Sequence, residues 1–192
     1  INRENYFSLM ENPKLNNFTR NKLCLEDIEI FPNTLYYLGT IARRKYHNIY
    51  IVHNKLCIYA IKAISIAELN KTNQKEMIIT KIVNERKLIK RLNHPFIIQY
   101  VKTLKIPNWC LFLEEYIHGM NLQDYIESYK PAKNIKVVKF YAGCLFIMLD
   151  VLSKCGIVHR NIKPENIVIN VNGYPRLIDF STGKRIKSKQ TK

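Results

Sequence analysis

Long apolar runs, acidic residues and paired cysteine motifs are all scarce in this sequence. The longest apolar run, Phe140 to Leu149, is too short to span a bilayer and is followed by Asp150. No segment has the pattern of a signal peptide, and no internal repeat is present. We therefore expect no membrane segment.

The cysteines show no C-x-x-C pair, and their number, five, is odd. A disulfide framework uses an even number of cysteines, and a structural zinc site usually brings its ligands in closely spaced pairs. The pattern therefore favours reduced thiols in a cytoplasmic protein.

Basic residues outnumber acidic ones: the sequence has 31 lysines and arginines but 15 aspartates and glutamates, which gives a net charge of +16. One interpretation is a basic structural component docked on an acidic surface such as a cytoskeletal filament, with cytoskeletal or ciliary association. The other is a lysine-rich and asparagine-rich composition without functional meaning. The lysines are scattered, which favours the second interpretation, and we do not expect nucleic acid as a partner. The densest basic run is residues 184–189.

The periodicity of apolar residues predicts an α+β protein, because β-rich runs precede longer helical segments. A hairpin is predicted from two β-rich runs joined by a polar turn, residues 48–52 and 56–62. The other predicted elements are a helix at 73–92, strands at 96–100 and 110–113, helices at 122–129 and 135–154, and strands at 167–170 and 176–178.

The longest predicted helix, residues 135–154, ends before Gly156, a residue type that favours helix termination. Its apolar residues recur at helical spacing and are expected on one face: Val138, Tyr141, Leu145, Met148 and Leu152.

The run from His159 to Asn166 carries the strongest chemical signal in the chain. It resembles the catalytic loop of protein kinases, H-R-D-x-x-x-x-N, with Asn161 where the pattern has aspartate. That aspartate accepts the proton of the substrate hydroxyl. An amide oxygen is a very weak base and an amide nitrogen only donates, so Asn161 does not perform this step.

Further motifs follow the same family's order: Tyr59-Ala60-Ile61-Lys62, Val83-Asn84-Glu85-Arg86 and Asp179-Phe180-Ser181. Together they resemble the eukaryotic protein kinase family over residues 34–192. Phe140-Tyr141-Ala142 and Gly183-Lys184-Arg185-Ile186 are most similar to the AGC group, with the cyclic-nucleotide-dependent Ser/Thr kinases as nearest members.

The resemblance implies a two-lobed α+β fold. Residues 34–116 would form an N-lobe of antiparallel strands with the helix named αC in this family. Residues 117–192 would form part of a mainly helical C-lobe, truncated after the Asp-Phe motif. Residues 1–33 are polar and would be an N-terminal extension or linker. The family's activation segment and later C-lobe helices are missing from the sequence, so we expect a longer native protein.

The resemblance also assigns the residues that handle ATP and Mg²⁺. Lys62 would hold the α- and β-phosphates and Glu85 would pair with it, while Asn166 and Asp179 would ligate Mg²⁺. Lys163 would belong to the catalytic loop.

Residues around the adenine and the ribose are assigned in the same way. Glu115 and Tyr116 would form the hinge, whose backbone binds adenine. Ala60 and Val168 would lie against the nucleotide, and Asn121 falls where relatives often keep a carboxylate for the ribose hydroxyls.

The glycine-rich loop of the family is missing. One alignment puts Ala42, Arg44 and His47 at the three glycine positions, and another anchors on Leu38-Gly39 and keeps one glycine. Glycine lets backbone N–H groups approach phosphates closely. Either Arg44 and His47 bind phosphate through their side chains, or the loop has lost that function.

Two more positions depart from the family. Glu114 falls at the gatekeeper position beside the adenine pocket, where a buried carboxylate is costly unless it is paired or protonated. Ser181 replaces the glycine after Asp-Phe and would stiffen that hinge.

By the same resemblance, His159 and Phe180 would stack with Ile89 and Tyr100 in an apolar spine, a packing role. Arg160, which in the family meets a phosphorylated activation loop, is expected to have no partner here.

These observations favour a pseudokinase, a kinase-like domain that works as a scaffold or regulatory module for other proteins, with residual Mg–ATP binding still open. A weakly active Ser/Thr kinase is the alternative, because phosphoryl transfer relies mainly on positioning and electrostatics. The basic structural component is a third hypothesis, compatible with the first.

Overall fold

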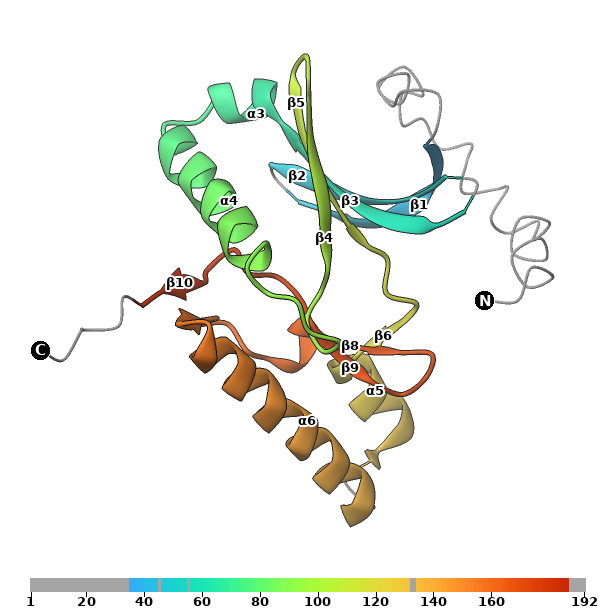
Figure 1. The fold of residues 1–192 in the computed structure, drawn as a ribbon. Coiled ribbons are helices and arrows are strands. Elements are labelled where there is room, and N and C mark those ends of the chain that lie inside the picture. The colour runs from blue at the N-terminus through green and yellow to red at the C-terminus, as the bar shows by residue number, and fades with distance from the viewer. Residues whose placement is uncertain (1–34, 45, 55, 132–133, 187–192) are drawn as a thin grey trace, which may run out of the picture. The chain divides into compact units, whose positions relative to one another are not determined.

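The computed structural model describes residues 35–44, 46–54, 56–131 and 134–186 (Figure 1). The expected extension at residues 1–33 lies outside these. The chain divides into two compact units, whose described residues lie within 35–71 and 101–116 for the first and within 72–100 and 117–186 for the second. The division after Tyr116 falls where the sequence places a domain boundary. Residues 72–100, however, group with the second unit, whereas the sequence assigns them to 34–116.

The first unit is built on a five-stranded sheet in the order β1-β2-β3-β5-β4 (Figure 1). Its strands are β1 (Tyr36–Arg43), β2 (His47–His53), β3 (Ile58–Ser65), β4 (Tyr100–Ile106) and β5 (Trp109–Glu115). Strands β2 and β3 pair antiparallel, which confirms the predicted hairpin.

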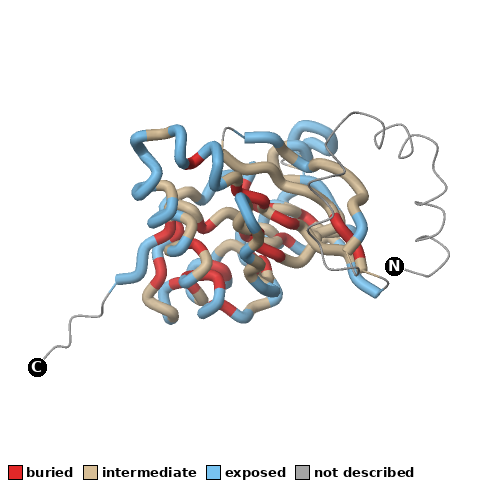
Figure 2. Tube along the Cα trace, turned by 90° about the horizontal axis from the view of Figure 1, so that it is seen from above, coloured by how far each residue is buried: buried red, intermediate tan, exposed pale blue. Residues whose placement is uncertain are grey.

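The apolar core of the first unit lies on one face of this sheet. Figure 2 marks the buried segments of the chain in red. The core residues alternate along their strands, as a pleated strand requires: Val52, Ile61, Ala63, Leu111 and Leu113. The short helix α3 (Ile66–Asn70) follows β3 and begins at Ser65, whose hydroxyl accepts the Glu68 N–H at 3.2 Å.

The second unit contains helices α4 (Lys75–Ile89), α5 (Leu122–Tyr129) and α6 (Ile135–Lys154). Helices α5 and α6 have the predicted bounds, because the sequence gives each a clear N-cap. The Asn121 side chain accepts the Asp124 N–H and the Asn134 side chain accepts the Lys136 N–H. Gly156, with φ of +63°, lies just past the C-cap of α6, as expected.

Short strands complete the second unit. Strands β6 (Gly119–Asn121), β8 (Ile167–Asn170) and β9 (Pro175–Leu177) form a sheet in the order β6-β8-β9. Strands β7 (Ile157–Val158) and β10 (Lys184–Arg185) pair antiparallel, and a 3₁₀ turn, η3, spans Pro164–Asn166.

A single apolar cluster holds the helices and small strands of the second unit together. Phe180 is fully buried in it, and α4 and α6 both contribute side chains. The buried members are Leu88, Ile89, Leu92, Ile97, Ile98, Met148, Leu152, Ile157, Ile167, Leu177 and Phe180.

One sequence prediction is wrong in detail. Residues 96–100 were expected to form a strand, but Ile97 makes only an isolated parallel bridge to Leu177, and β4 begins at Tyr100. In the long helix, the buried side of α6 centres on Cys144, Met148 and Leu152, and Val138 is 41% exposed.

The α+β class is confirmed in both units. Among the residues that the structure describes, no helix combines the length and apolar character needed to cross a membrane. The four described cysteines are free thiols.

Candidate functional site

The segment that follows β7 places His159 at the centre of the second unit. Its ring centroid lies 4.6 Å from that of Phe180 in an edge-to-face arrangement, and Phe180 shares an apolar cluster with Ile89 and Tyr100. The expected contact between His159 and Phe180 is confirmed. His159 Nε2 lies 3.0 Å from the Ile178 carbonyl oxygen, so the tautomer that fits carries its proton on Nε2 and donates it.

Burial lowers the pKa of His159 from its usual 6.5, opposed by the hydrogen bond to Ile178 and the charge of Asp179. Its Nδ1 is buried and lacks a hydrogen-bond partner among the described residues. His159 is therefore a neutral packing residue at neutral pH, which matches the role expected for it.

Asn161 and Asn166 are joined through the backbone of the loop. The Asn166 side-chain Nδ2 donates to the Asn161 carbonyl oxygen at 2.9 Å, and the Asn166 carbonyl accepts the Ile178 N–H at 2.9 Å. Asn166 is only 7% exposed. Because its amide nitrogen is committed to the loop, the side-chain oxygen is the end that remains to ligate a cation.

Asp179 stands in the left-handed region, with φ of +60°. This conformation is unfavourable for most residues but is tolerated by aspartate. Its Oδ1 accepts the Ser181 N–H at 3.3 Å, a local bond that supports the turn. Asp179 and Asn166 thus offer one carboxylate and one amide oxygen within the same unit, a donor set that suits Mg²⁺ completed by water and phosphate oxygens.

Arg160 has a partner, contrary to expectation. Its Nε donates to the Thr182 carbonyl oxygen at 2.6 Å, and the Thr182 hydroxyl donates to the His159 carbonyl at 3.1 Å. The guanidinium is thus bound by the chain's own backbone immediately after the Asp-Phe-Ser motif. The sequence does not reveal this bond, because its acceptor is a carbonyl group that every residue has.

In the first unit, Lys62 lies on the sheet face opposite the apolar core. Residues directly opposed in neighbouring strands share a face. Ala60 faces Glu114 of β5, and Lys62 is two residues further along β3. Ala42 of β1 faces Ile49, which faces Lys62. The register therefore places four predicted site residues on one face of the sheet. Three are assigned to the nucleotide by the resemblance and the fourth is the gatekeeper: Ala42, Ala60, Lys62 and Glu114.

Glu114 is half-buried, so the full cost of a buried carboxylate does not apply. It lies on the Lys62 face, next to a cationic side chain in the adjacent strand.

The turn that replaces the glycine-rich loop lies between Arg44 and His47, where the Arg44 N–H donates to the His47 carbonyl at 2.9 Å. Arg43 and Arg44 are exposed. Arginine side chains in this turn are thus accessible to an anion, but a backbone approach like that of glycine is not available, because each position carries a Cβ.

The expected hinge and ribose positions lie at the ends of strands. Glu115 is the last residue of β5, and Tyr116 follows it. Burial raises the pKa of Tyr116 above 10. In the second unit, Asn121 and Val168 are directly opposed in the β6–β8 pair, so these two candidates lie together. Asn121 also caps α5, which gives it a structural role.

Lys163 and Glu85 complete the predicted set. Lys163 precedes η3, is exposed, and lies 3.7 Å from Glu165 Oε1. Glu85 is buried on α4. Lys62 belongs to the first unit and Glu85 to the second, so their ion pair stays a prediction.

Residues 45–192 match the protein kinase domain family. The chain belongs to that family. The kinase-like fold class and the resemblance to cyclic-nucleotide-dependent kinases of the AGC group are thereby confirmed.

Among its relatives, a cGMP-dependent protein kinase of Plasmodium berghei (strain Anka) is 29% identical over 191 residues, which cover 97% of this chain and 21% of the relative. A cAMP-dependent protein kinase catalytic subunit of Arthrobotrys oligospora is 30% identical over 168 residues, covering 88% and 30%. The cGMP-dependent protein kinase 2 of Rattus norvegicus is 29% identical over 139 residues, covering 72% and 18%. The chain thus spans less than a third of each.

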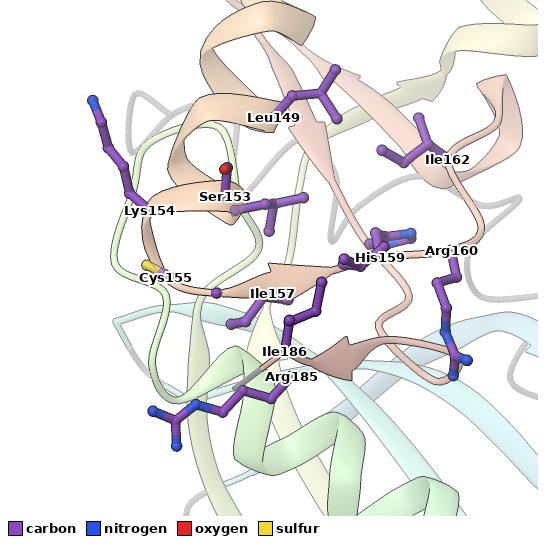
Figure 3. A pocket seen from close by; sticks show the side chains of 13 residues that line it. Leu149, Ser153, Lys154, Cys155, Ile157, His159, Arg160, Ile162, Arg185 and Ile186 are labelled. Carbon is purple, nitrogen blue, oxygen red and sulfur yellow. The ribbon is translucent and has the colours of Figure 1, made fainter. Parts of the chain in front are cut away.

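An open pocket of about 880 Å³ lies in the second unit of this kinase domain, beside the start of the catalytic loop (Figure 3). It is bordered by the end of α6, by β7 and by β10, and includes His159, Arg160 and Ile162. None of the residues assigned to ATP or Mg²⁺ lines it. The sequence motifs do not predict this pocket, because they mark residues of the nucleotide and metal sites and none of those residues lines it.

Two further residues near the Asp-Phe motif were not foreseen. Asn84 Nδ2 donates to the Gly183 carbonyl oxygen at 2.7 Å, across 99 positions of sequence. Gly183 is buried and packs against Leu88. The sequence shows only that an asparagine precedes Glu85 and that a glycine lies four residues after Asp179. Neither residue by itself indicates that the two are in contact.

Proposed function

We propose that this kinase domain binds Mg²⁺–ATP weakly, does not transfer the γ-phosphoryl group efficiently, and acts as a regulatory or scaffold module for other proteins. The observation that carries the proposal is Asn161 at the position of the catalytic base. A general base typically contributes about 10²–10⁴-fold to the rate, and an amide does not replace it.

The residues expected to hold the nucleotide support residual binding. Lys62 and Ala60 lie on one face of the first unit, and Asn166 and Asp179 offer oxygen donors in the second. A bound Mg²⁺ would neutralise charge on the phosphates. The chain's part would be to orient these donors, with the Asn166 amide fixed by its bond to the Asn161 carbonyl.

Two features of the first unit favour weak affinity. The turn at Arg44 and His47 has no glycine, so fewer backbone N–H groups reach the phosphates. Glu114 adds a carboxylate on the Lys62 face, where it competes with phosphate for the lysine charge.

Thermal-shift titration of the full-length protein tests nucleotide binding. We expect a small rise in Tm with ATP that depends on Mg²⁺, because ligands that bind only the folded state stabilise it. Asp179→Asn should remove the Mg²⁺-dependent part. Tight binding that ignores both Mg²⁺ and this substitution would contradict the proposed site.

Glu114→Met provides a matched test on the same face. Removal of one carboxylate near the phosphates should strengthen binding by about 1 kcal/mol, or several-fold in Kd, for charges at this separation in a partly exposed setting. Glu68→Gln, an exposed glutamate on α3 outside the residues assigned to the nucleotide, is the control. An unchanged or weaker Kd in Glu114→Met would show that Glu114 does not limit affinity.

An active Ser/Thr kinase of the cyclic-nucleotide-dependent type is the second candidate. It is favoured by the retained Lys62, Glu85, Asn166 and Asp179 and by the ordered His159–Phe180 packing. The names of the relatives support this class of activity for them. Phosphate transfer to a protein serine or threonine by the wild type would favour this candidate.

A further inference from the structure

Gly183, four residues after Asp179, is held by two side chains of α4. The first contact is polar: Asn84 Nδ2 donates to the Gly183 carbonyl oxygen at 2.7 Å. This bond joins the helix that carries Glu85 to the segment that carries Asp179, and both belong to the second unit.

The second contact is steric. A Cβ added at Gly183 would lie 2.6 Å from Leu88 Cδ1 and 3.1 Å from the Phe180 carbonyl oxygen. Leu88 is itself only 2% exposed, so it has little room to move. The φ angle of Gly183 lies outside the left-handed region. Glycine is therefore required here for space and not for backbone conformation.

Asn84 and Leu88 are four residues apart on α4, so they lie on one face of the helix, one above the other. Both reach the same residue. A shift or rotation of α4 must therefore either carry Gly183 with it or break the hydrogen bond.

Hydrogen bonds made by the residues between Asp179 and Gly183 link the position of Gly183 to the conformation of Asp179. The Gly183 N–H donates to the Phe180 carbonyl at 2.9 Å, and the Thr182 carbonyl accepts from Arg160. Figure 3 shows the Arg160 side chain extending toward the segment that leads into β10. Asp179 has a φ of +60°, a conformation that persists where neighbouring contacts fix it.

We propose that Asn84 and Leu88 form a clamp on Gly183 that fixes the turn from Asp179 to Gly183, which makes Asn84 a positioning residue for the Asp179 carboxylate. The metal role of Asp179 rests on the proposed function. The polar bond of the clamp joins two neutral groups, so its strength is independent of ionic strength, unlike an ion pair.

Native-state hydrogen exchange in the full-length protein without nucleotide tests the clamp. In Asn84→Ala, the amide hydrogens of Ser181, Gly183 and Ile186 should exchange about fivefold faster, the effect of one lost hydrogen bond on local opening. Lys87→Ala, an exposed change on the same helix, is the control and should leave them unchanged. Equal exchange in both variants would overturn the clamp.

A second set of variants covers the case in which Asn84→Ala fails to fold. Gly183→Ala should speed exchange of the same amides, because its methyl group meets Leu88. Leu88→Val removes the contacting Cδ1, so the double variant should exchange within about twofold of Leu88→Val alone. If Leu88→Val leaves the Gly183→Ala effect unchanged, the steric part of the clamp is wrong.

The positioning role has its own readout. The Mg²⁺-dependent part of the ATP-induced Tm shift should fall in Asn84→Ala, while the part without Mg²⁺ stays the same. A full Mg²⁺-dependent shift in Asn84→Ala would overturn the positioning role. If the wild type gives no Mg²⁺-dependent shift, the metal role fails with the proposed function, and the exchange result alone decides whether the clamp exists.

Discussion

Asn161 differs from aspartate by one amide group, nearly the same size but without basicity. In this chain the loop is held through the Asn161 carbonyl, which accepts from the Asn166 side chain. Every residue type supplies that carbonyl. The exchange of aspartate for asparagine therefore removes a proton acceptor without removing the contact that shapes the loop.

The packing of His159 against Phe180 was predictable from the sequence, because the kinase-like pattern assigns both residues to one apolar spine. The structure places their rings in contact. The partner of Arg160 was not predictable, since its acceptor is the Thr182 backbone.

A pH dependence follows from the buried His159. Its pKa is lowered in the folded state, so the unfolded chain binds more protons as the pH falls below 6.5. The free energy of unfolding should therefore be highest above pH 6.5 and should decrease on acidification through that value. His118, whose pKa is also lowered by burial, adds to the same trend.

Thermal melts between about pH 8 and pH 5 measure this effect, because the ordinary pKa of histidine lies inside that range. His159→Phe keeps an aromatic ring but removes the titrating group, so its Tm should vary less with pH than that of the wild type. A variant with the same slope as the wild type would show that His159 does not contribute to the acid sensitivity.

At the scale of elements, the long helices were predictable and the short strands were not. Helix α6 combines twenty residues of helical periodicity, an Asn134 cap and a terminating Gly156. Strands β7 and β10 have two residues each and exist only because they pair with one another. The apolar run at residues 96–98 was mistaken for a strand because buried segments of any shape are rich in the same residues.

Two glycines in the second unit should respond to alanine in opposite directions. Gly119 lies in β6, where an added Cβ would be 1.8 Å from the Ile169 carbonyl oxygen, so the β6–β8 pair must open. Gly143 is exposed inside α6 with no atom within 4 Å of an added Cβ. Gly119→Ala should destabilise by about 2 kcal/mol or more, and Gly143→Ala should stabilise by about 0.5–1 kcal/mol.

Urea unfolding of both variants gives these values directly. The comparison is matched, since both changes add one methyl group within the same unit. A stable Gly119→Ala variant would mean that β6 is not held against β8 as described.

For the whole molecule, the net charge of +16 is the feature that the fold does not explain. If the charge serves docking on an acidic surface, the full-length protein should bind immobilised polyglutamate and lose most of that binding between about 0.05 and 0.2 M salt. Absence of binding at low salt, or binding that ignores salt, would leave composition as the explanation of the charge.

The domain as a whole keeps its folded core while several family positions have changed. Asn161 lies in the second unit, and Arg44, His47 and Glu114 lie in the first. The retained residues Lys62, Asn166 and Asp179 handle phosphate and metal in the family that the chain belongs to. These residues support the proposed nucleotide binding, but none of them supplies a proton acceptor for the substrate hydroxyl.

Transfer of labelled phosphate from ATP to a peptide by the full-length protein tests the proposed loss of phosphotransfer most directly. We predict no transfer above background in the wild type, and none in Asn161→Asp, because Arg44, His47 and Glu114 still weaken nucleotide binding. Lys62→Ala serves as the reference for contaminating activity. Robust transfer by the wild type that disappears in Lys62→Ala would contradict the account.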